Sequence, residues 1–287
     1  MSEPLRDMTP KPVLEHRTPS RPVLLTGASG ALGRRIATYL GACGWTLRLT
    51  DIAPFPDPLP ADVTFERADL EDGVAMLRLA EGCGTILHFG GVSTEHPFEA
   101  VLGPNIRGAF HVYEAARRER ARVVFASSNH SIGFHERDEP LDDDCSLLPD
   151  TYYGLSKAYT VLMGRMYWFK HGVESVAVRI GSCFPEPIEA RMLSTWLSYD
   201  DLCRLCERAT LAASVGNCVI WGASDNRATF WRRDARADLG WLPQDSADPF
   251  TGQLAAKTSG NPVTERYQGG SYAAMGYTRA TPALKLA

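Results

Sequence analysis

A glycine-rich turn near the start of this 287-residue chain restricts its possible folds more than any other feature. Gly27, Gly30 and Gly33 follow the short apolar run Val23 to Thr26 and open the segment Ala31 to Cys43, which has the apolar spacing of a helix. In a strand–turn–helix unit, such glycines permit a tight turn, close approach of the backbone to a pyrophosphate, and close packing of the helix on the strand. The helix N-terminus also favours an anion. A glycine-rich turn without a ligand is the alternative interpretation.

The rest of the chain alternates short apolar runs with longer amphipathic segments, which is typical of a parallel sheet covered by helices on both faces. The predicted strands are Val23 to Thr26, Thr46 to Asp51, Val63 to Ala68, Thr85 to Phe89, Val123 to Ser127, Ser175 to Ile180 and Cys218 to Trp221. The predicted helices are Ala31 to Cys43, Gly73 to Glu81, Ile106 to Arg120, Tyr152 to His171, Ser198 to Ala213 and a short piece around Ala235 to Leu239. The fold class is therefore α/β, with a Rossmann-type doubly wound parallel sheet of about seven strands.

The predicted organisation has three parts. Residues 1–20 are rich in proline and charge and predict a flexible arm. Residues 21–180 predict a dinucleotide-binding domain, and residues 181–287 predict a small substrate-binding region and tail, which also contributes the last strand.

Composition excludes several classes of partner. Thirty basic against 34 acidic residues give a net charge of −4, without the basic excess that nucleic-acid binding requires. No apolar run approaches the ~18 residues that a membrane span requires. Seven scattered cysteines and no secretory leader favour a cytoplasmic location. Cys203 and Cys206 form a CxxC without a second ligand pair, so we expect helix packing there and predict no metal site.

Acidic residues after two strands indicate which dinucleotide is bound. Asp51 lies 18 residues beyond Gly33, where a carboxylate accepts hydrogen bonds from the adenosine ribose, although capping a turn is the alternative. Because no arginine or lysine occurs between Ile52 and Glu66, NAD is favoured over NADP. Asp69, with Leu70, follows the third strand and is placed to contact the adenine or to form a turn. Gly90 would let the chain pass close to the cofactor.

A YxxxK motif supplies candidate catalytic groups. Tyr153 and Lys157 are four residues apart on a predicted helix and therefore share one face. We expect Lys157, together with the positive nicotinamide, to lower the pKa of the Tyr153 phenol so that it can act as a base. Ser128, at the end of the fifth strand, is the candidate for orienting the substrate oxygen, and Ser127 is its competitor. The predicted cofactor contacts from these motifs are Gly27, Gly30, Ala31, Leu32, Gly33, Asp51, Asp69, Leu70, Gly90 and Lys157.

These motifs resemble the extended short-chain dehydrogenase/reductase superfamily over roughly residues 21 to 245, and Leu239 to Pro243 is similar to its late LGWxP element. Within that superfamily the chain resembles the uronate dehydrogenases. The similar blocks are Phe125 to Gly133, Val178 to Pro187, Arg191 to Trp196, Trp221 to Ser224 and Tyr267 to Tyr272.

The resemblance implies NAD-dependent oxidation of glucuronate or galacturonate at the anomeric carbon, giving an aldarolactone, in a homo-oligomer and by implication a hexamer. It implies substrate contacts at Ser93, Ser128, Asn129, His130, Ser182 and Arg191. It also places Cys183 and Asn105 near the cofactor or substrate. Arg191 would bind the sugar carboxylate bidentately, although a surface arginine is the alternative. His130 could instead be a packing residue and Ser93 a turn residue, and His88 is interpreted as structural.

Two other functions remain open. A nucleotide-sugar epimerase or dehydratase shares the glycine turn and YxxxK, but such enzymes usually carry R-x-x-N after the sixth strand, where this chain has Arg179-Ile180-Gly181-Ser182. A non-catalytic NAD-sensing regulator is a second alternative, and the intact Tyr153 and Lys157 disfavour it.

Overall fold

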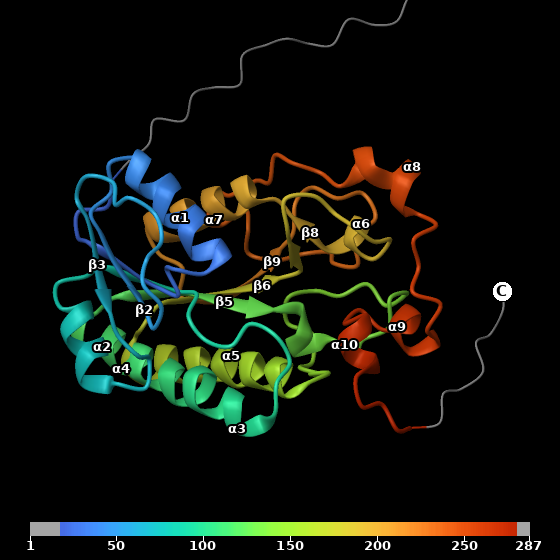
Figure 1. Cartoon of the computed structure of the whole chain (residues 1–287), viewed down its shortest axis with the longest axis horizontal. Coiled ribbons are helices and arrows are strands. Elements are labelled where there is room, and N and C mark those ends of the chain that lie inside the picture. The colour runs from blue at the N-terminus through green and yellow to red at the C-terminus, as the bar shows by residue number, and fades with distance from the viewer. Residues whose placement is uncertain (1–17, 280–287) are drawn as a thin grey trace, which may run out of the picture.

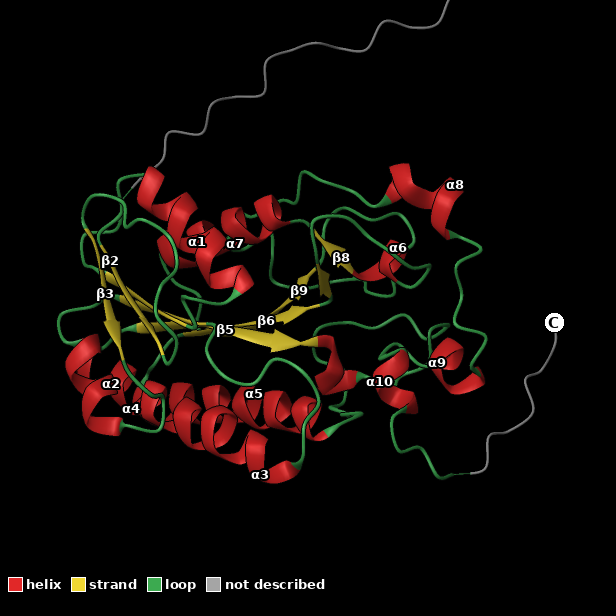
Figure 2. Ribbon diagram, viewed as in Figure 1, coloured by secondary structure: helices red, strands yellow, loops and turns green. Residues whose placement is uncertain are grey.

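The computed structural model describes residues 18–279, and its centre is a seven-stranded, all-parallel sheet (Figures 1 and 2). The strands are β1 (Val23–Thr26), β2 (Leu47–Asp51), β3 (Val63–Arg67), β4 (Thr85–His88), β5 (Arg122–Ser128), β6 (Ser175–Ile180) and β9 (Asn217–Gly222). Their order across the sheet is β3-β2-β1-β4-β5-β6-β9, so the chain reverses its direction of winding between β1 and β4. This confirms the predicted fold class and places a ligand crevice at the carboxyl ends of the strands.

Helices cover both faces of the sheet (Figure 2). One face carries α1 (Ala31–Ala42) and α7 (Tyr199–Leu211); the other carries α2 (Gly73–Ala80), α4 (Gly108–Glu119) and α5 (Tyr152–His171). Each layer forms its own hydrophobic core against the sheet. Because both sheet faces are covered, β1, β4, β5 and β6 are buried along their whole length, which explains their continuous apolar runs.

Helix α5 is fixed at both ends by its own sequence. The hydroxyl of Thr151 accepts a hydrogen bond from Gly154 N at its N-terminus, and Gly172 at its C-terminus has a positive φ of 68°. These caps set where α5 begins and ends, and Tyr153 lies in its first turn.

The chain beyond β6 adds β9 to the sheet and α7 to one of its faces, and otherwise forms short elements at one end of the molecule (Figure 1). β7 (Ser182–Cys183) pairs with β8 (Trp196–Leu197). The short helices there are α6 (Met192–Thr195), η3 (Asp248–Phe250), α8 (Thr251–Leu254), α9 (Pro262–Arg266) and α10 (Ser271–Ala274). Whether residues 181–287 behave as a separate domain stays a prediction.

The predicted elements differ from the structure in a few places. The predicted helix around Ala235 to Leu239 is wrong, because residues 235–240 form successive turns. The helix predicted from Ile106 begins earlier, as α3 (Phe98–Val101) followed by the π-helix η1 (Leu102–Arg107). Pro104 lies inside η1 and, together with two glycines, weakens the sequence signal for a helix. A 3-10 turn, η2 (Asn129–Ile132), directly follows β5.

Other expectations concern single residues or termini. Cys203 and Cys206 are buried in α7, as expected for helix packing. His88 is buried in β4, where its Nδ1 lies 2.8 Å from the Thr26 hydroxyl. Burial lowers its pKa to about 3, and its structural interpretation is confirmed.

Residues 1–17, most of the predicted arm, lie outside the described residues. Within residues 18–279, no helix is both long enough and apolar enough to span a membrane.

Candidate active site

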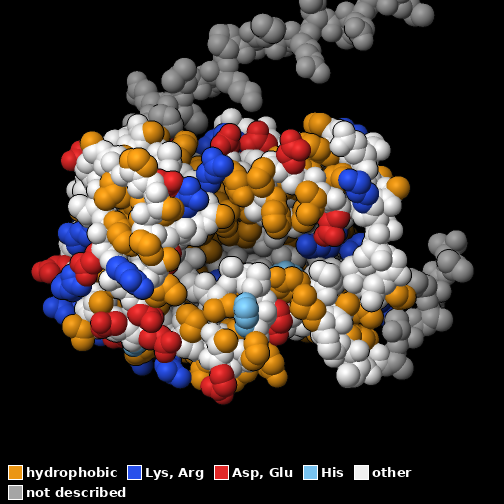
Figure 3. All heavy atoms as spheres, viewed as in Figure 1, with side chains coloured by type: hydrophobic (Ala, Val, Ile, Leu, Met, Phe, Trp, Pro, Cys, Tyr) orange, Lys and Arg blue, Asp and Glu red, His pale blue; other side chains and the backbone are white. Residues whose placement is uncertain are grey.

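A cavity of about 1010 Å³ opens at the carboxyl edge of the sheet. Figure 3 shows the hollow near the middle of one face, with hydrophobic side chains gathered around it. Its walls come from the segments that follow β1, β2, β3, β4 and β6, from the end of β5, and from α5, α6 and α10. Its size and its polar and apolar lining are those of a site for a cofactor together with a small substrate.

The glycine turn leaves one end of the cavity open to a ligand. Gly27 has φ +72°, and a Cβ there would lie 2.5 Å from Gly90 N. A Cβ on Gly33 would overlap the Gly27 carbonyl, so α1 can begin this close to β1 only with glycine. Gly30 is the N-cap of α1 and makes no side-chain cap, which leaves the first amides of α1 facing the cavity. This arrangement fits the pyrophosphate of a dinucleotide.

The acidic residues predicted for the adenosine end also hold turns. Asp51 accepts hydrogen bonds from Ser29 N at 3.0 Å and Ala53 N at 3.1 Å. Asp69 accepts one from Glu71 N at 2.9 Å. Both line the cavity, so the turn roles and the predicted ligand roles are compatible.

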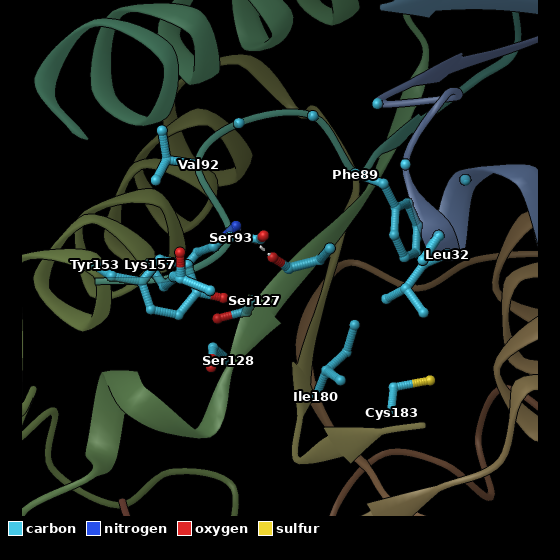
Figure 4. Close-up of a pocket in the computed structure, with 18 of the residues that line it drawn as sticks. Leu32, Phe89, Val92, Ser93, Ser127, Ser128, Tyr153, Lys157, Ile180 and Cys183 are labelled. Carbon is cyan, nitrogen blue, oxygen red and sulfur yellow. Dashed lines mark hydrogen bonds between the residues drawn. The ribbon is translucent and has the colours of Figure 1, made fainter. Parts of the chain in front are cut away.

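All the predicted cofactor contacts line the cavity, namely Gly27, Gly30, Ala31, Leu32, Gly33, Asp51, Asp69, Leu70, Gly90, Lys157 and Cys183. Figure 4 shows Leu32, Phe89, Ile180 and Cys183 on one side. On the opposite side it shows Ser127, Ser128, Tyr153 and Lys157. The apolar side chains and the candidate catalytic side chains therefore face each other across the cavity.

The candidate base and the candidate orienting hydroxyl meet at the ends of two elements. Tyr153 lies in the first turn of α5, and Ser128 is the last residue of β5. Burial raises the pKa of Tyr153 to about 12, while a hydrogen bond with the Ser128 side chain acts in the lowering direction. Desolvation is the largest effect on the phenol in the protein alone, and the lowering of its pKa expected from Lys157 together with the nicotinamide stays a prediction.

Lys157 lies one turn further along α5 and is itself buried. Its Nζ donates a hydrogen bond to the Ala126 carbonyl at 2.8 Å and lies 4.8 Å from the Phe125 ring centroid and 5.5 Å from the Tyr153 ring centroid. Burial lowers the pKa of Lys157 to about 7. The ammonium is thus held against one edge of the cavity beside the phenol.

Both candidate serines line the cavity. The Ser128 hydroxyl accepts a hydrogen bond from His130 N at 3.2 Å and contacts Tyr153. The Ser127 hydroxyl is buried and has no hydrogen-bond partner among residues 18–279. The contact with Tyr153 favours Ser128 as the orienting residue.

A second polar region contains the candidate carboxylate-binding arginine. Arg191 Nη1 donates to the Gln268 carbonyl at 3.1 Å, Nη2 donates to Ser182 Oγ at 3.3 Å, and Nε lies 3.3 Å from Glu189 Oε1. Its side chain is 12% exposed, and burial lowers its pKa. Arg191 is therefore a largely buried cation in the cavity wall and not a surface arginine.

Several residues of this region were not predicted as site residues. Tyr272, on α10, lines the cavity and stacks on His130 with ring centroids 4.0 Å apart. Asp150 Oδ2 lies 2.8 Å from His130 Nδ1. Gln268 supplies the carbonyl that contacts Arg191. The similarity block Tyr267 to Tyr272 pointed to this segment without assigning any of its side chains a role.

Two predicted substrate contacts do not reach the cavity wall. Asn105 is buried, and its Oδ1 accepts a hydrogen bond from Val92 N at 2.7 Å. Its Nδ2 donates to the Val92 carbonyl at 3.0 Å and to the Ser156 hydroxyl at 2.9 Å. It therefore holds the loop that carries Ser93. Asn129 is completely buried beneath Gln268. By contrast, Ser93, Ser128, His130, Ser182 and Arg191 line the cavity.

The burial of Lys157 leads to a prediction about stability in the absence of ligand. Between pH ~7 and ~10.5 the unfolded chain binds a proton that the folded chain has released, so the free energy of unfolding rises with pH in this window. Replacing the buried cation removes its desolvation cost. We expect Lys157→Met to melt a few degrees above wild type at pH 6.5, with the difference shrinking towards pH 9.5, as measured by calorimetry. Tyr153→Phe is the control, because its melting difference should not vary over that range; equal pH dependence in Lys157→Met and wild type would contradict the assignment.

Comparisons with known proteins identify the family. Residues 23–228 match the NAD dependent epimerase/dehydratase family. The uronate dehydrogenase of Pseudomonas putida is 46% identical over 262 residues, which cover 90% of this chain and 98% of that protein. The uronate dehydrogenase of Agrobacterium fabrum is 42% identical over 254 residues, covering 87% and 96%.

Solved structures agree with this result. The crystal structure of uronate dehydrogenase from Agrobacterium tumefaciens has a TM-score of 0.83 and 42% identity, covering 88% of this chain and 97% of that one. A tyrosine mutant of that enzyme, complexed with NAD, has a TM-score of 0.84 and 41% identity, covering 90% and 98%. The chain therefore belongs to the NAD dependent epimerase/dehydratase family and, within it, to the uronate dehydrogenases, which are NAD-dependent oxidoreductases.

Proposed function

We propose that this chain oxidises the anomeric carbon of D-glucuronate or D-galacturonate to the aldarolactone, with NAD as the oxidant. The observation that carries the proposal is a largely buried guanidinium, Arg191, in the same cavity as the buried pair Tyr153 and Ser128. A uronate has an anomeric hydroxyl at one end and a carboxylate at the other, so it matches both regions at once.

The glycine turn and Asp51 would hold the dinucleotide, and Lys157 would hold its nicotinamide ribose. NAD, when bound, would supply the oxidising equivalent and the positive charge of its nicotinamide. That charge acts against the rise in the phenol pKa that burial causes. The residues of the glycine turn leave the space and the free amides that this role requires.

In the oxidation, Tyr153 accepts the proton of the anomeric hydroxyl while C1 loses its hydrogen together with two electrons. Ser128 donates a hydrogen bond to the anomeric oxygen as it becomes a carbonyl. Arg191 fixes the carboxylate end and so limits the motion of C1 relative to the base. The product leaves as a lactone, and no step requires water.

The alternative of a nucleotide-sugar epimerase or dehydratase is less well supported. The dTDP-glucose 4,6-dehydratase DesIV from Streptomyces venezuelae is 18% identical to this chain and shares only the fold. After β6 this chain places Ser182 and Arg191 in the cavity wall. Net formation of NADH from a uronate would separate the proposal from an epimerase, which returns the hydrogen to its substrate. A non-catalytic NAD sensor would not need Tyr153 and Lys157 on the cavity wall.

We propose, in addition, that the enzyme is a homo-oligomer in which α5 contacts a second copy of the chain. Six large apolar side chains on α5 are 42–77% exposed: Tyr152, Leu155, Tyr159, Leu162, Met166 and Phe169. Their spacing alternates between three and four residues, so they form one continuous stripe. Such a spacing suits packing against the same helix of another copy.

A cytoplasmic location is also part of the proposal. All seven cysteines are unpaired, as in proteins of a reducing compartment.

The base is tested by Tyr153→Phe. We expect kcat for the uronates to fall by about 10²–10⁴, because the proton acceptor is removed, with the NAD dissociation constant changed less than threefold. Steady-state kinetics and calorimetric NAD titration measure the two quantities. Turnover near the wild-type rate would show that another group is the base.

The carboxylate site is tested by Arg191→Gln. We expect kcat/KM for glucuronate to fall by about 100-fold, because a charge-assisted pair is lost. The loss for glucose, which has no carboxylate, should be much smaller, and NAD binding should be unchanged. Equal losses for the acid and the neutral sugar would place Arg191 outside carboxylate recognition.

The α5 contact is tested by the double variant Leu162→Glu, Met166→Glu. We expect light scattering to give the mass of a single chain, 31.5 kDa, where wild type gives a multiple of it. Val74→Glu is the control, because Val74 is an apolar residue on α2 that is 78% exposed and lies outside this stripe. A monomeric wild type, or an unchanged mass in the double variant, would contradict the proposed contact.

A further inference from the structure

A buried carboxylate lies behind the catalytic end of the cavity. Asp150 precedes α5, and its side chain is completely inaccessible to solvent. Its Oδ2 lies 2.8 Å from His130 Nδ1, and its Oδ1 accepts a hydrogen bond from the Thr151 hydroxyl at 3.0 Å. Burying an ionised carboxylate is costly unless its oxygens are paired, and here both are.

Three glycines from separate segments make room for this carboxylate. A Cβ added at Gly133 or at Gly269 would overlap Asp150 Oδ2, and one at Gly154 would lie 3.0 Å from Oδ1 and overlap the His130 carbonyl. Gly269 N also donates to the Gly133 carbonyl at 2.9 Å. The loop after β5, the start of α5 and the C-terminal segment therefore all meet at Asp150.

The carboxylate determines which nitrogen of His130 carries hydrogen. An ionised carboxylate only accepts hydrogen bonds, so Nδ1 must be the donor and neutral His130 has a lone pair on Nε2. Among residues 18–279, no hydrogen bond is made to Nε2. The His130 ring lines the cavity, stacks on Tyr272 at 4.0 Å, and lies edge-on to Tyr153 at 5.9 Å.

We propose that Asp150 is a positioning residue that fixes His130 as the Nδ1–H tautomer, so that Nε2 accepts a hydrogen bond from a sugar hydroxyl. Which sugar hydroxyl this is follows from the positions of Tyr153, Ser128 and His130, and the identification rests on the proposed function. Tyr153 and Ser128 take the anomeric oxygen, and His130 lies beside both (Figure 4 shows Tyr153 and Ser128 together). In a pyranose, the neighbouring group that can donate a hydrogen is the 2-hydroxyl.

The tautomer can be measured without substrate. In solid-state ¹⁵N spectra of histidine-labelled enzyme, we expect a signal with a protonated Nδ1 and an unprotonated Nε2 that disappears in His130→Gln. His111, whose Nδ1 lies 2.9 Å from the Leu70 carbonyl, should keep the same tautomer in that variant. A protonated Nε2 on neutral His130 in the wild-type protein would overturn the proposal.

The consequence for the substrate is tested with Asp150→Asn and a 2-deoxyuronate. An amide at position 150 can donate to Nδ1, so the Nε2–H tautomer should appear in the spectrum. We expect KM for the parent uronate to rise about tenfold with a smaller change in kcat, and kcat/KM for the 2-deoxyuronate to change less than twofold. An unchanged KM for the parent, or an equal loss for both sugars, would show that Asp150 is only structural.

Asp201→Asn is the matched control, because Asp201 is a fully buried carboxylate on α7 away from the cavity. It should not change the ratio of kcat/KM between the two sugars. Failure of wild type to oxidise any uronate would refute the proposed function while leaving the tautomer measurement valid. Normal uronate oxidation with the wrong tautomer would refute only the role of Asp150.

Discussion

The hydrogen bond from Lys157 Nζ to the Ala126 carbonyl joins α5 to the carboxyl edge of β5, and the geometry of the catalytic end depends on it. Removing an ammonium from water is unfavourable, as the lowered pKa of Lys157 shows. In return for this desolvation, the hydrogen bond fixes the position of α5 relative to β5. Tyr153 is carried by α5 and Ser128 by β5, and their contact requires that the first turn of α5 stay at the end of that strand. A helix that slid along the sheet would separate them.

The cofactor end could be predicted from the sequence because its determinants are local. Gly27, Gly30 and Gly33 act within one turn, and the strand and helix on either side are contiguous with them. The pairing of Tyr153 with Lys157 is likewise set by the helical repeat. In a parallel sheet, the loops that follow the strands all lie at the same edge. Residues after β2 and β4 could therefore be assigned to the cavity from the predicted strands alone.

The rest of the site depends on contacts between distant segments, which no local pattern reveals. Tyr272 reaches His130 from a four-residue helix near the end of the described chain. Asn105 and Asn129 have the polar side chains expected of substrate contacts, but packing turns them towards backbone groups. Burial also raises the pKa of Tyr153 in the protein alone. This desolvation depends on how the whole chain folds, so the spacing of Tyr153 and Lys157 in the sequence does not reveal it.

The surroundings of Arg191 explain how one site can select acidic sugars. Gln268 and Ser182 offer its guanidinium neutral acceptors, and its charged neighbour Glu189 is 43% exposed and therefore weakened by solvent. The Gln268 side chain is itself fixed by Trp231 and by two backbone carbonyls, so the acceptor facing Arg191 is rigid. The buried charge is thus held in place but only partly compensated. A sugar carboxylate would complete the compensation, whereas a neutral sugar would cover the cation and deprive it of water without providing an anion, and that difference in free energy favours the uronate.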